Sequence, residues 1–310
     1  YINNDLKNLL VYYAKTIDDN CYYELIVGLL IYMQKKYISA EIIDRDLWEE
    51  VDDPNDLRIA NFRFNPNKKL EILNKTMGGY WSYPIIDFTF IRNMYFPDDS
   101  LLNELSINMK EALRNYGSKQ SILNEKISYV LEIDKRNVLA LNGATQAYPI
   151  LKLILKDKIV AIPEVTFGEY YKLGKAQVEY DDISNIPDNI DSVVIVNPNN
   201  PDGLELDRER IMDLIEAREH VLFIVDESFI EFSYYNSIRQ FTLKRKYSNV
   251  ILLGSMSKSY GLPGIRLGYL ISANTTLIES ISEHLPIWGL NRLAETYLEL
   301  LLKRKNMLKL

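Results

Sequence analysis

Six short apolar runs, separated by helix-like stretches, follow one another through the second half of the chain. Each run is β-branched or leucine-rich and apolar at consecutive positions, which is typical of strands covered on both faces. The runs occupy residues 137–142, 158–163, 192–197, 221–226, 249–254 and 266–272. Strands that alternate with helices predict an α/β fold, with a mostly parallel sheet sandwiched by helices.

Two stretches in this part have the period of a helix. In 207–220, Ile211, Leu214 and Ile215 lie on one face, and Asp207 is placed to cap the first turn. Residues 290–304 carry a second apolar stripe of this kind.

The first part of the chain has a different pattern. Residues 1–36 are periodic like helices, and a short strand is expected from Leu47 to Val51. A turn at Asp53-Pro54 then leads into a helix from Asn55, and the polar, glycine-bearing stretch after it is typical of a connector.

This change of pattern predicts two domains joined by a linker. We expect a remnant domain over 1–66, a linker over 67–86 and a larger domain over 87–310. The chain starts at Tyr1 and stops at Leu310, just after a helix-like stretch, so we expect a fragment of a longer protein.

Composition narrows the class of protein. The net charge of -7 favours neither nucleic acid nor an anionic membrane as a partner. Cys21 is the single cysteine, which fits a reducing cytoplasm. The longest apolar run, 25–33, is too short to span a bilayer, and no secretory signal is visible.

Ligands of parallel sheets sit at the carboxyl ends of the strands, so the residues after each run are candidates. Gly143 begins a turn whose helix could bind phosphate, although an ordinary turn has the same pattern. Phe167 could stack on a flat ring or belong to the core. In NPNNPDG (197–203), one asparagine could bind a ligand, or the stretch is a surface turn.

Two further strand ends carry charged side chains. Asp226 ends an apolar run, where a carboxylate needs a cation or several donors unless it caps the next segment. Lys258 in SMSKSYG could form a Schiff base with an aldehyde, although a solvated lysine is the commoner case. Arg266 could bind a phosphate.

Together these strand ends indicate one cofactor. A Schiff-base lysine, an acid for a pyridine nitrogen and a phosphate cup are what pyridoxal 5'-phosphate (PLP) requires. The acid keeps the ring protonated, so that the ring can accept electrons from the substrate's α-carbon.

The order of NPNNPDG, DESFIEF (226–232) and SMSKSYGLPGIRLGY resembles the class I and II aminotransferases of fold type I. The nearest branch is that of histidinol-phosphate aminotransferase and threonine-phosphate decarboxylase. The resemblance implies that Lys258 and Asp226 are catalytic and that Asn200 binds the ring hydroxyl. It also implies that Phe167 stacks on the ring. The implied phosphate ligands are Ala144, Thr145, Ser255, Ser257 and Arg266.

The resemblance also implies a homodimer, in which Tyr116 of NYGSKQS reaches the phosphate in the neighbouring subunit. The sequence departs from the family's pattern in three ways. Phe229 replaces the tyrosine usual in this branch's aminotransferases, as it does in the decarboxylases. The proline after the tyrosine of that motif is missing. The C-terminal small domain, with its carboxylate-binding arginine, is expected beyond Leu310.

The stretch LWEEVDDPNDLRIA resembles the closing motif of sugar-phosphate and phosphocholine-type nucleotidyltransferases. There the acids that match Glu50 and Asp52 bind Mg²⁺, and hard carboxylate oxygens suit that ion. Their spacing places both on one side of a strand. A solvated acidic turn is the alternative.

A nucleotidyltransferase joined to an aminotransferase resembles the bifunctional enzymes of phosphonate assembly. The function expected is a PLP-dependent aminotransferase acting on a small phosphorylated or phosphonate amine, in a pathway to 2-aminoethylphosphonate and its cytidylyl derivative. The alternatives are a decarboxylase of the threonine-phosphate type, a histidinol-phosphate aminotransferase and a non-catalytic dimerisation scaffold.

Overall fold

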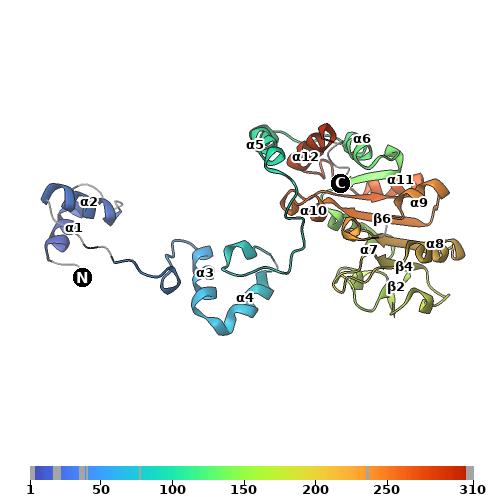
Figure 1. Ribbon diagram of the computed structural model, residues 1–310, viewed down its shortest axis with the longest axis horizontal. Coiled ribbons are helices and arrows are strands. Elements are labelled where there is room, and N and C mark those ends of the chain that lie inside the picture. The colour runs from blue at the N-terminus through green and yellow to red at the C-terminus, as the bar shows by residue number, and fades with distance from the viewer. Residues whose placement is uncertain are drawn as a thin grey trace. The chain divides into compact units, whose positions relative to one another are not determined.

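The computed structural model describes residues 4–16, 22–34, 39, 41–76, 78–234 and 237–304 (Figure 1). The chain divides into two compact units, Tyr1–Phe88 and Thr89–Leu310. Cys21 lies outside the described residues. Within the described part, no helix combines the length and the apolar character needed to cross a membrane.

Among the described residues of the first unit, the regular structure is helical. Its helices are α1 (Asn4–Thr16), α2 (Tyr23–Gln34), α3 (Pro54–Phe64) and α4 (Lys69–Thr76). Two of these bear out the helices predicted in 1–36, apart from residues 1–3, 17–21 and 35–36, which lie outside the described residues. The stretch expected as a linker, 67–86, contains α4.

The strand predicted from Leu47 to Val51 is wrong. A 3-10 turn covers Arg45–Leu47, and the residues up to the N-cap Asp53 are irregular. A strand needs a neighbour for its backbone groups, and the described part of this unit has none. Instead Arg63 Nη1 donates to the carbonyl oxygens of Arg45 and Trp48.

Helix α3 begins where its sequence allows. The Asp53 side chain accepts hydrogen bonds from the amides of Asn55 and Asp56, and the Asp56 side chain accepts one from the Asp53 amide. This capping box satisfies the free amides of the first turn. Phe62, on the same helix, is buried against the ring of Tyr83.

The second unit is built on a sheet whose seven strands, among the described residues, run in the order β1-β7-β6-β5-β4-β2-β3. All pairs are parallel except those of β7 with β1 and β6. The strands are β1 (Val138–Leu141), β2 (Ile159–Pro163), β3 (Ala176–Tyr180), β4 (Ser192–Val196), β5 (Leu222–Asp226), β6 (Val250–Ser255) and β7 (Gly268–Ile271). The predicted α/β fold and its six strands are confirmed.

The sequence did not predict β3. Its first four residues are exposed or half-buried, and only Tyr180 is buried. It pairs with β2 alone at the edge of the sheet, so it lacks the continuous apolar run of the central strands.

Helices cover both faces of the sheet (Figure 1). On one face, side chains of α5, α6, α8 and α12 form a core with alternate strand residues, and on the other face α7 and α11 do the same. Helix α8 has the predicted Asp207 cap. The helices of this unit are α5 (Asp99–Arg114), α6 (Gln120–Leu131), α7 (Ala147–Ile154), α8 (Arg208–Ala217), α9 (Arg239–Arg245), α10 (Met256–Ser259), α11 (Thr275–Glu283) and α12 (Arg292–Lys303).

Candidate active site

One pocket gathers nine of the residues that the sequence singled out in the second unit. It lies where β4, β5 and β6 end, because parallel strands present their carboxyl ends at the same edge of the sheet. The predicted residues that line it are Ala144, Thr145, Phe167, Asn200, Asp226, Ser255, Ser257, Lys258 and Arg266.

Lys258 enters the pocket from α10, directly after β6. Burial is the main cause that lowers the pKa of its amine, the Arg266 charge adds to this, and Asp226 opposes it. Its Nζ lies 5.4 Å from the centre of the Phe229 ring. A lowered pKa increases the fraction of neutral amine, which is the nucleophilic form.

Asp226 is the last residue of β5 and is only 3% exposed. The Tyr170 hydroxyl donates to its Oδ2 at 2.5 Å, and the Ser228 amide donates to its Oδ1 at 2.9 Å. Burial nevertheless raises the pKa of this carboxyl, because desolvation outweighs the hydrogen bonds from Ser228 and Tyr170 and the Lys258 charge. An anion here therefore calls for a further cationic partner in the pocket.

At the other end of the pocket, a turn and an arginine form a cradle. Gly143 has a φ of 80°, and a Cβ added to it would lie 2.6 Å from Arg266 Nη2. The positive φ favours glycine at this position, and the absence of a Cβ leaves room for the guanidinium. Arg266 Nη2 also donates to Thr145 Oγ1 at 3.1 Å.

Two serines complete the cradle. The Ser255 hydroxyl caps α10 by accepting from the Ser257 amide at 3.3 Å. Ser257 is 2% exposed, and its own hydroxyl is buried without a hydrogen-bond partner among the described residues. A buried hydroxyl in that state is costly unless a ligand accepts from it.

The structure separates the roles of the three asparagines in NPNNPDG. Asn197 exchanges hydrogen bonds with Leu206, and Asn199 donates to Val165 and Asp202, so both hold the turn. Asn200 lines the pocket. The pattern alone did not distinguish these two structural asparagines from the third.

The sequence missed two tyrosines. Tyr148 lines the pocket, and Tyr170 lies behind it, fully buried against Asp226. Tyr148 meets Tyr170 edge to face at 5.5 Å and lies 5.9 Å from Phe167. The spacing of Phe167 and Tyr170, three residues apart in a tight turn, was the available signal.

Tyr116 does not line the pocket within this chain. It is 78% exposed and stacks on Trp288 with ring centres 4.5 Å apart. Its implied contact with a neighbouring subunit stays a prediction.

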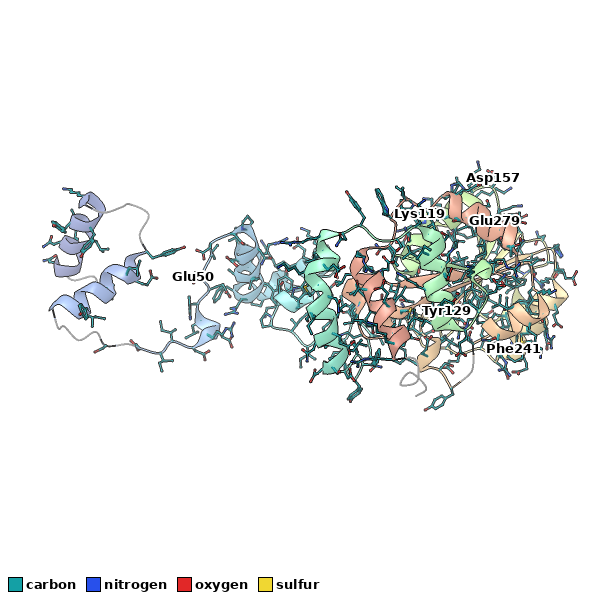
Figure 2. The ribbon with its side chains drawn as sticks, turned by 90° about the horizontal axis from the view of Figure 1, so that it is seen from above. Glu50, Lys119, Tyr129, Asp157, Phe241 and Glu279 are labelled. Carbon is teal, nitrogen blue, oxygen red and sulfur yellow. The ribbon has the colours of Figure 1, made fainter. Side chains whose placement is uncertain are left out.

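Glu50 and Asp52 belong to the first unit, where Figure 2 shows Glu50 on the segment before α3. Both are exposed, and neither lies in a strand. Their placement on one side of a strand is therefore wrong. No cluster of three or more potential metal ligands occurs among the described residues, and the Mg²⁺ site stays a prediction.

The pocket fits the cofactor that the sequence predicted. The unpartnered Ser257 hydroxyl and the Arg266 guanidinium over Gly143 suit a phosphate group. The buried Asp226 suits a protonated ring nitrogen, and Lys258 suits an aldehyde. These features are parts of one cavity, so a single ligand can reach all of them.

Comparison with known proteins agrees with this geometry. The family model described as aminotransferase class I and II matches residues 108–287. PLP is the cofactor expected of that family.

Among curated relatives, the chain is 33% identical over 273 residues to CMP-5'-(3-aminopropyl)phosphonate synthase of Streptomyces rubellomurinus, which covers 82% of this chain and 43% of that protein. It is 32% identical over 220 residues to L-serine phosphate decarboxylase of Campylobacter jejuni, covering 63% of this chain and 56% of the relative. The chain thus spans about half the length of the curated relatives it matches.

A solved structure also matches. L-threonine-O-3-phosphate decarboxylase from Porphyromonas gingivalis superposes with a TM-score of 0.65 and 26% identity, over 73% of this chain and 71% of the other. The match to the phosphonate synthase covers 82% of this chain, which is a larger share than Thr89–Leu310 makes up. The likeness therefore extends into the first unit.

Proposed function

This chain belongs to the aminotransferase class I and II family, and from that premise we propose what the whole protein does. It is a PLP-dependent enzyme that acts on the amino group of a small substrate bearing a phosphate or phosphonate. The observation that carries the proposal is the convergence of Lys258, Asp226 and Arg266 on one pocket.

PLP, when bound, supplies an electron-accepting ring that stabilises negative charge on the substrate's α-carbon. The chain's residues prepare the site for it. Arg266, Thr145 and Ser257 would bind the phosphate, and Asn200 would bind the ring hydroxyl. Phe167 would pack on the ring, and Asp226 would hold the proton on the ring nitrogen.

Lys258 has two tasks that its environment supports. Its amine would hold the cofactor's aldehyde, and the same nitrogen, when free, would move a proton at the substrate's α-carbon. Because burial and Arg266 lower its pKa, more of the amine is neutral near pH 7 and able to accept that proton.

Amino-group transfer on an aminoalkylphosphonate is the first candidate reaction. The family's description and a relative named for aminopropylphosphonate support it. The same likeness, which enters the first unit, supports a fused nucleotidyltransferase that uses Mg²⁺ at Glu50 and Asp52.

Decarboxylation of a phosphorylated or phosphonate amino acid is the second candidate, and Phe229 favours it. Its ring faces Lys258 Nζ, where the branch's aminotransferases are expected to carry a tyrosine hydroxyl. Relatives named for serine phosphate and threonine phosphate decarboxylation support the same reaction. Loss of CO₂ also leaves a primary amine, the group that an aminopropylphosphonate carries.

We also propose that the protein is a homodimer in which Tyr116 approaches the partner's phosphate. Its exposure, shared with Trp288, supports a surface that another subunit covers. The enzyme would then have paired sites. Sedimentation of the full-length protein as a monomer would contradict this.

The test begins with the full-length protein, PLP and borohydride. We expect reduction to fix the cofactor on Lys258, as peptide mass spectrometry would reveal. Label on another lysine, or absence of a visible absorbance band, refutes the proposal and supports a scaffold without catalysis.

A second measurement separates the two reactions. Phosphonate and phosphate amino acids are supplied with and without a keto acid, and released CO₂ is counted against amino-group transfer. CO₂ release without transfer supports decarboxylation, and transfer without CO₂ supports an aminotransferase. If no phosphorus-bearing substrate gives either product while another amino acid is turned over, the proposed substrate class is overturned.

A further inference from the structure

Tyr170 lies at the back of the pocket, against the acid that the cofactor ring requires. It begins a 3-10 turn, Tyr170–Lys172, and is 0% exposed. Its amide donates to the carbonyl of Phe167 at 3.0 Å, which ties it to the aromatic side chain that lines the pocket. This bond fixes the turn that joins the two residues.

The Asp226 carboxylate is held at both oxygens. Tyr170 donates to Oδ2 through its side chain, and Ser228 donates to Oδ1 through its backbone. The Ser228 side chain adds a further hydrogen bond to this carboxylate, so Tyr170 is one of two residues whose side chains stabilise the anion. A hydroxyl that donates to a carboxylate makes a charge-assisted hydrogen bond, which is stronger than one between neutral groups.

Tyr148 backs this contact from the other side. Its ring meets that of Tyr170 at an interplanar angle of 80° and that of Phe167 at 40°. Tyr148 and Phe167 also line a second hollow beside the pocket, together with Lys152 and Lys172. These rings therefore stand between Asp226 and that open hollow.

We propose that Tyr170 is a positioning residue whose hydroxyl, backed by Tyr148, holds Asp226 as the oriented anion that faces the cofactor's ring nitrogen. The inference rests on the proposed function, because it assigns a role toward PLP. It gives a purpose to a buried tyrosine that the binding of phosphate and substrate does not use.

Electrostatics gives the reason that such a residue is needed. Burial raises the pKa of Asp226, because desolvation acts against the charged form of a carboxyl. A donated hydrogen bond stabilises the anion and opposes that rise. Burial and the nearby Asp226 charge raise the pKa of Tyr170 itself, so its hydroxyl keeps the proton that it donates.

The decisive variant is Tyr170→Phe in the full-length protein. Without the donor, Asp226 competes for the ring nitrogen's proton, and the ring carries less positive charge. The Lys258 nitrogen linked to PLP then keeps its proton to higher pH. We expect the pH midpoint of the visible absorbance change to rise by about one unit, and the PLP dissociation constant to rise roughly tenfold to 100-fold.

Tyr180→Phe is the matched control. It also removes a hydroxyl from a buried tyrosine, whose hydrogen bond to the Val194 carbonyl is 2.6 Å long, but it does not contact Asp226. A general loss of stability affects both variants alike. Only Tyr170→Phe should change the absorbance midpoint, and an equal change in both overturns the inference.

A second substitution keeps the test open if Tyr170→Phe does not fold. Replacing Tyr170 by 3-fluorotyrosine preserves the ring and makes the hydroxyl more acidic, hence a stronger donor. The absorbance midpoint should then fall below that of the unmodified protein. A midpoint unchanged in the folded variants overturns the role of Tyr170, whereas an unmodified protein without any absorbance band overturns the proposed function instead.

Discussion

The two units of the chain place their acidic residues in opposite environments. In the second unit, Asp226 and Glu227 are 3% and 1% exposed at the end of a central strand. In the first unit, Glu50 and Asp52 lie exposed before α3. Burial changes the proton affinity of a carboxyl, and exposure leaves it solvated. The comparison therefore locates acid–base chemistry in the second unit.

Within the second unit, the two neighbouring acids differ as well. Successive residues of a strand point to opposite faces of the sheet. Asp226 meets Tyr170 on the pocket side, whereas Glu227 accepts from the Ser237 hydroxyl and the Ile238 amide on the other face. One acid faces the site, and its neighbour is part of the scaffold.

Removing the Arg266 guanidinium should have the largest effect, which is on PLP binding. We expect Arg266→Ala to weaken PLP binding about 100-fold, because a charge-assisted contact to phosphate is lost. Alanine faces the same backbone cost as arginine at a φ of 56°, so the turn itself should not change. Equilibrium dialysis of the full-length protein with PLP measures the constant.

Arg210→Ala is the control for this variant. Arg210 also forms an ion pair, with Asp182 at 2.8 Å, but on the surface and outside the pocket. Its loss should leave PLP affinity unchanged. Equal weakening by the two variants would break the distinction between pocket charges and surface charges.

Glu227→Gln should have the next largest effect, on stability. Burial raises the pKa of Glu227 to about 7, from a model-peptide value of 4.5, and Glu231 adds to the rise while Arg239 opposes it. The folded state therefore binds a proton that the unfolded state releases. Its contribution to stability is complete below about pH 4.5 and is lost as the pH rises through about 7.

The variant should abolish that loss. Between pH 5 and pH 8, the free energy of unfolding should fall by about 2 to 3 kcal/mol less in Glu227→Gln than in the unmodified protein. Urea unfolding followed by circular dichroism measures the difference. Glu219→Gln, at an exposed position, should keep the unmodified pH dependence, and so would Glu227→Gln if the buried acid were not responsible.

The sequence predicted the parts of this arrangement that depend on parallel strands. Strands buried on both faces are apolar throughout, and their carboxyl ends must meet, so Asn200, Asp226 and Lys258 could be grouped before their positions were known. Tyr170 could not be found this way. Its role depends on how a 3-10 turn rotates its ring, and the chain has 22 tyrosines.

The errors lie where structure depends on partners distant in sequence. The Leu47–Val51 strand was inferred from local pattern, but the described residues of the first unit supply no neighbouring strand, and Arg63 takes up the carbonyls instead. The edge strand β3 was missed for the converse reason, because β2 pairs with a segment that is mostly exposed and has no continuous apolar run.

Substituting the acids of the first unit should have the smallest effect on this chain. Within the described part, the side chains of Glu50 and Asp52 form no hydrogen bond or ion pair that the fold depends on, whereas Asp53 caps α3. We expect Glu50→Ala with Asp52→Ala to leave both stability and PLP affinity nearly unchanged. Asp53→Ala should lower the stability of α3 by about 1 kcal/mol.

The same double variant tests the proposed Mg²⁺ site in the full-length protein. If the acids bind Mg²⁺ there, Mg²⁺-dependent nucleotidyl transfer should be lost while borohydride still fixes PLP on Lys258. If nucleotidyl transfer is retained, the role left for the acidic turn is to cap α3 through Asp53. A tenfold change in PLP affinity would contradict the separation between the two units. The exposed acids of the first unit would then act on the buried site of the second.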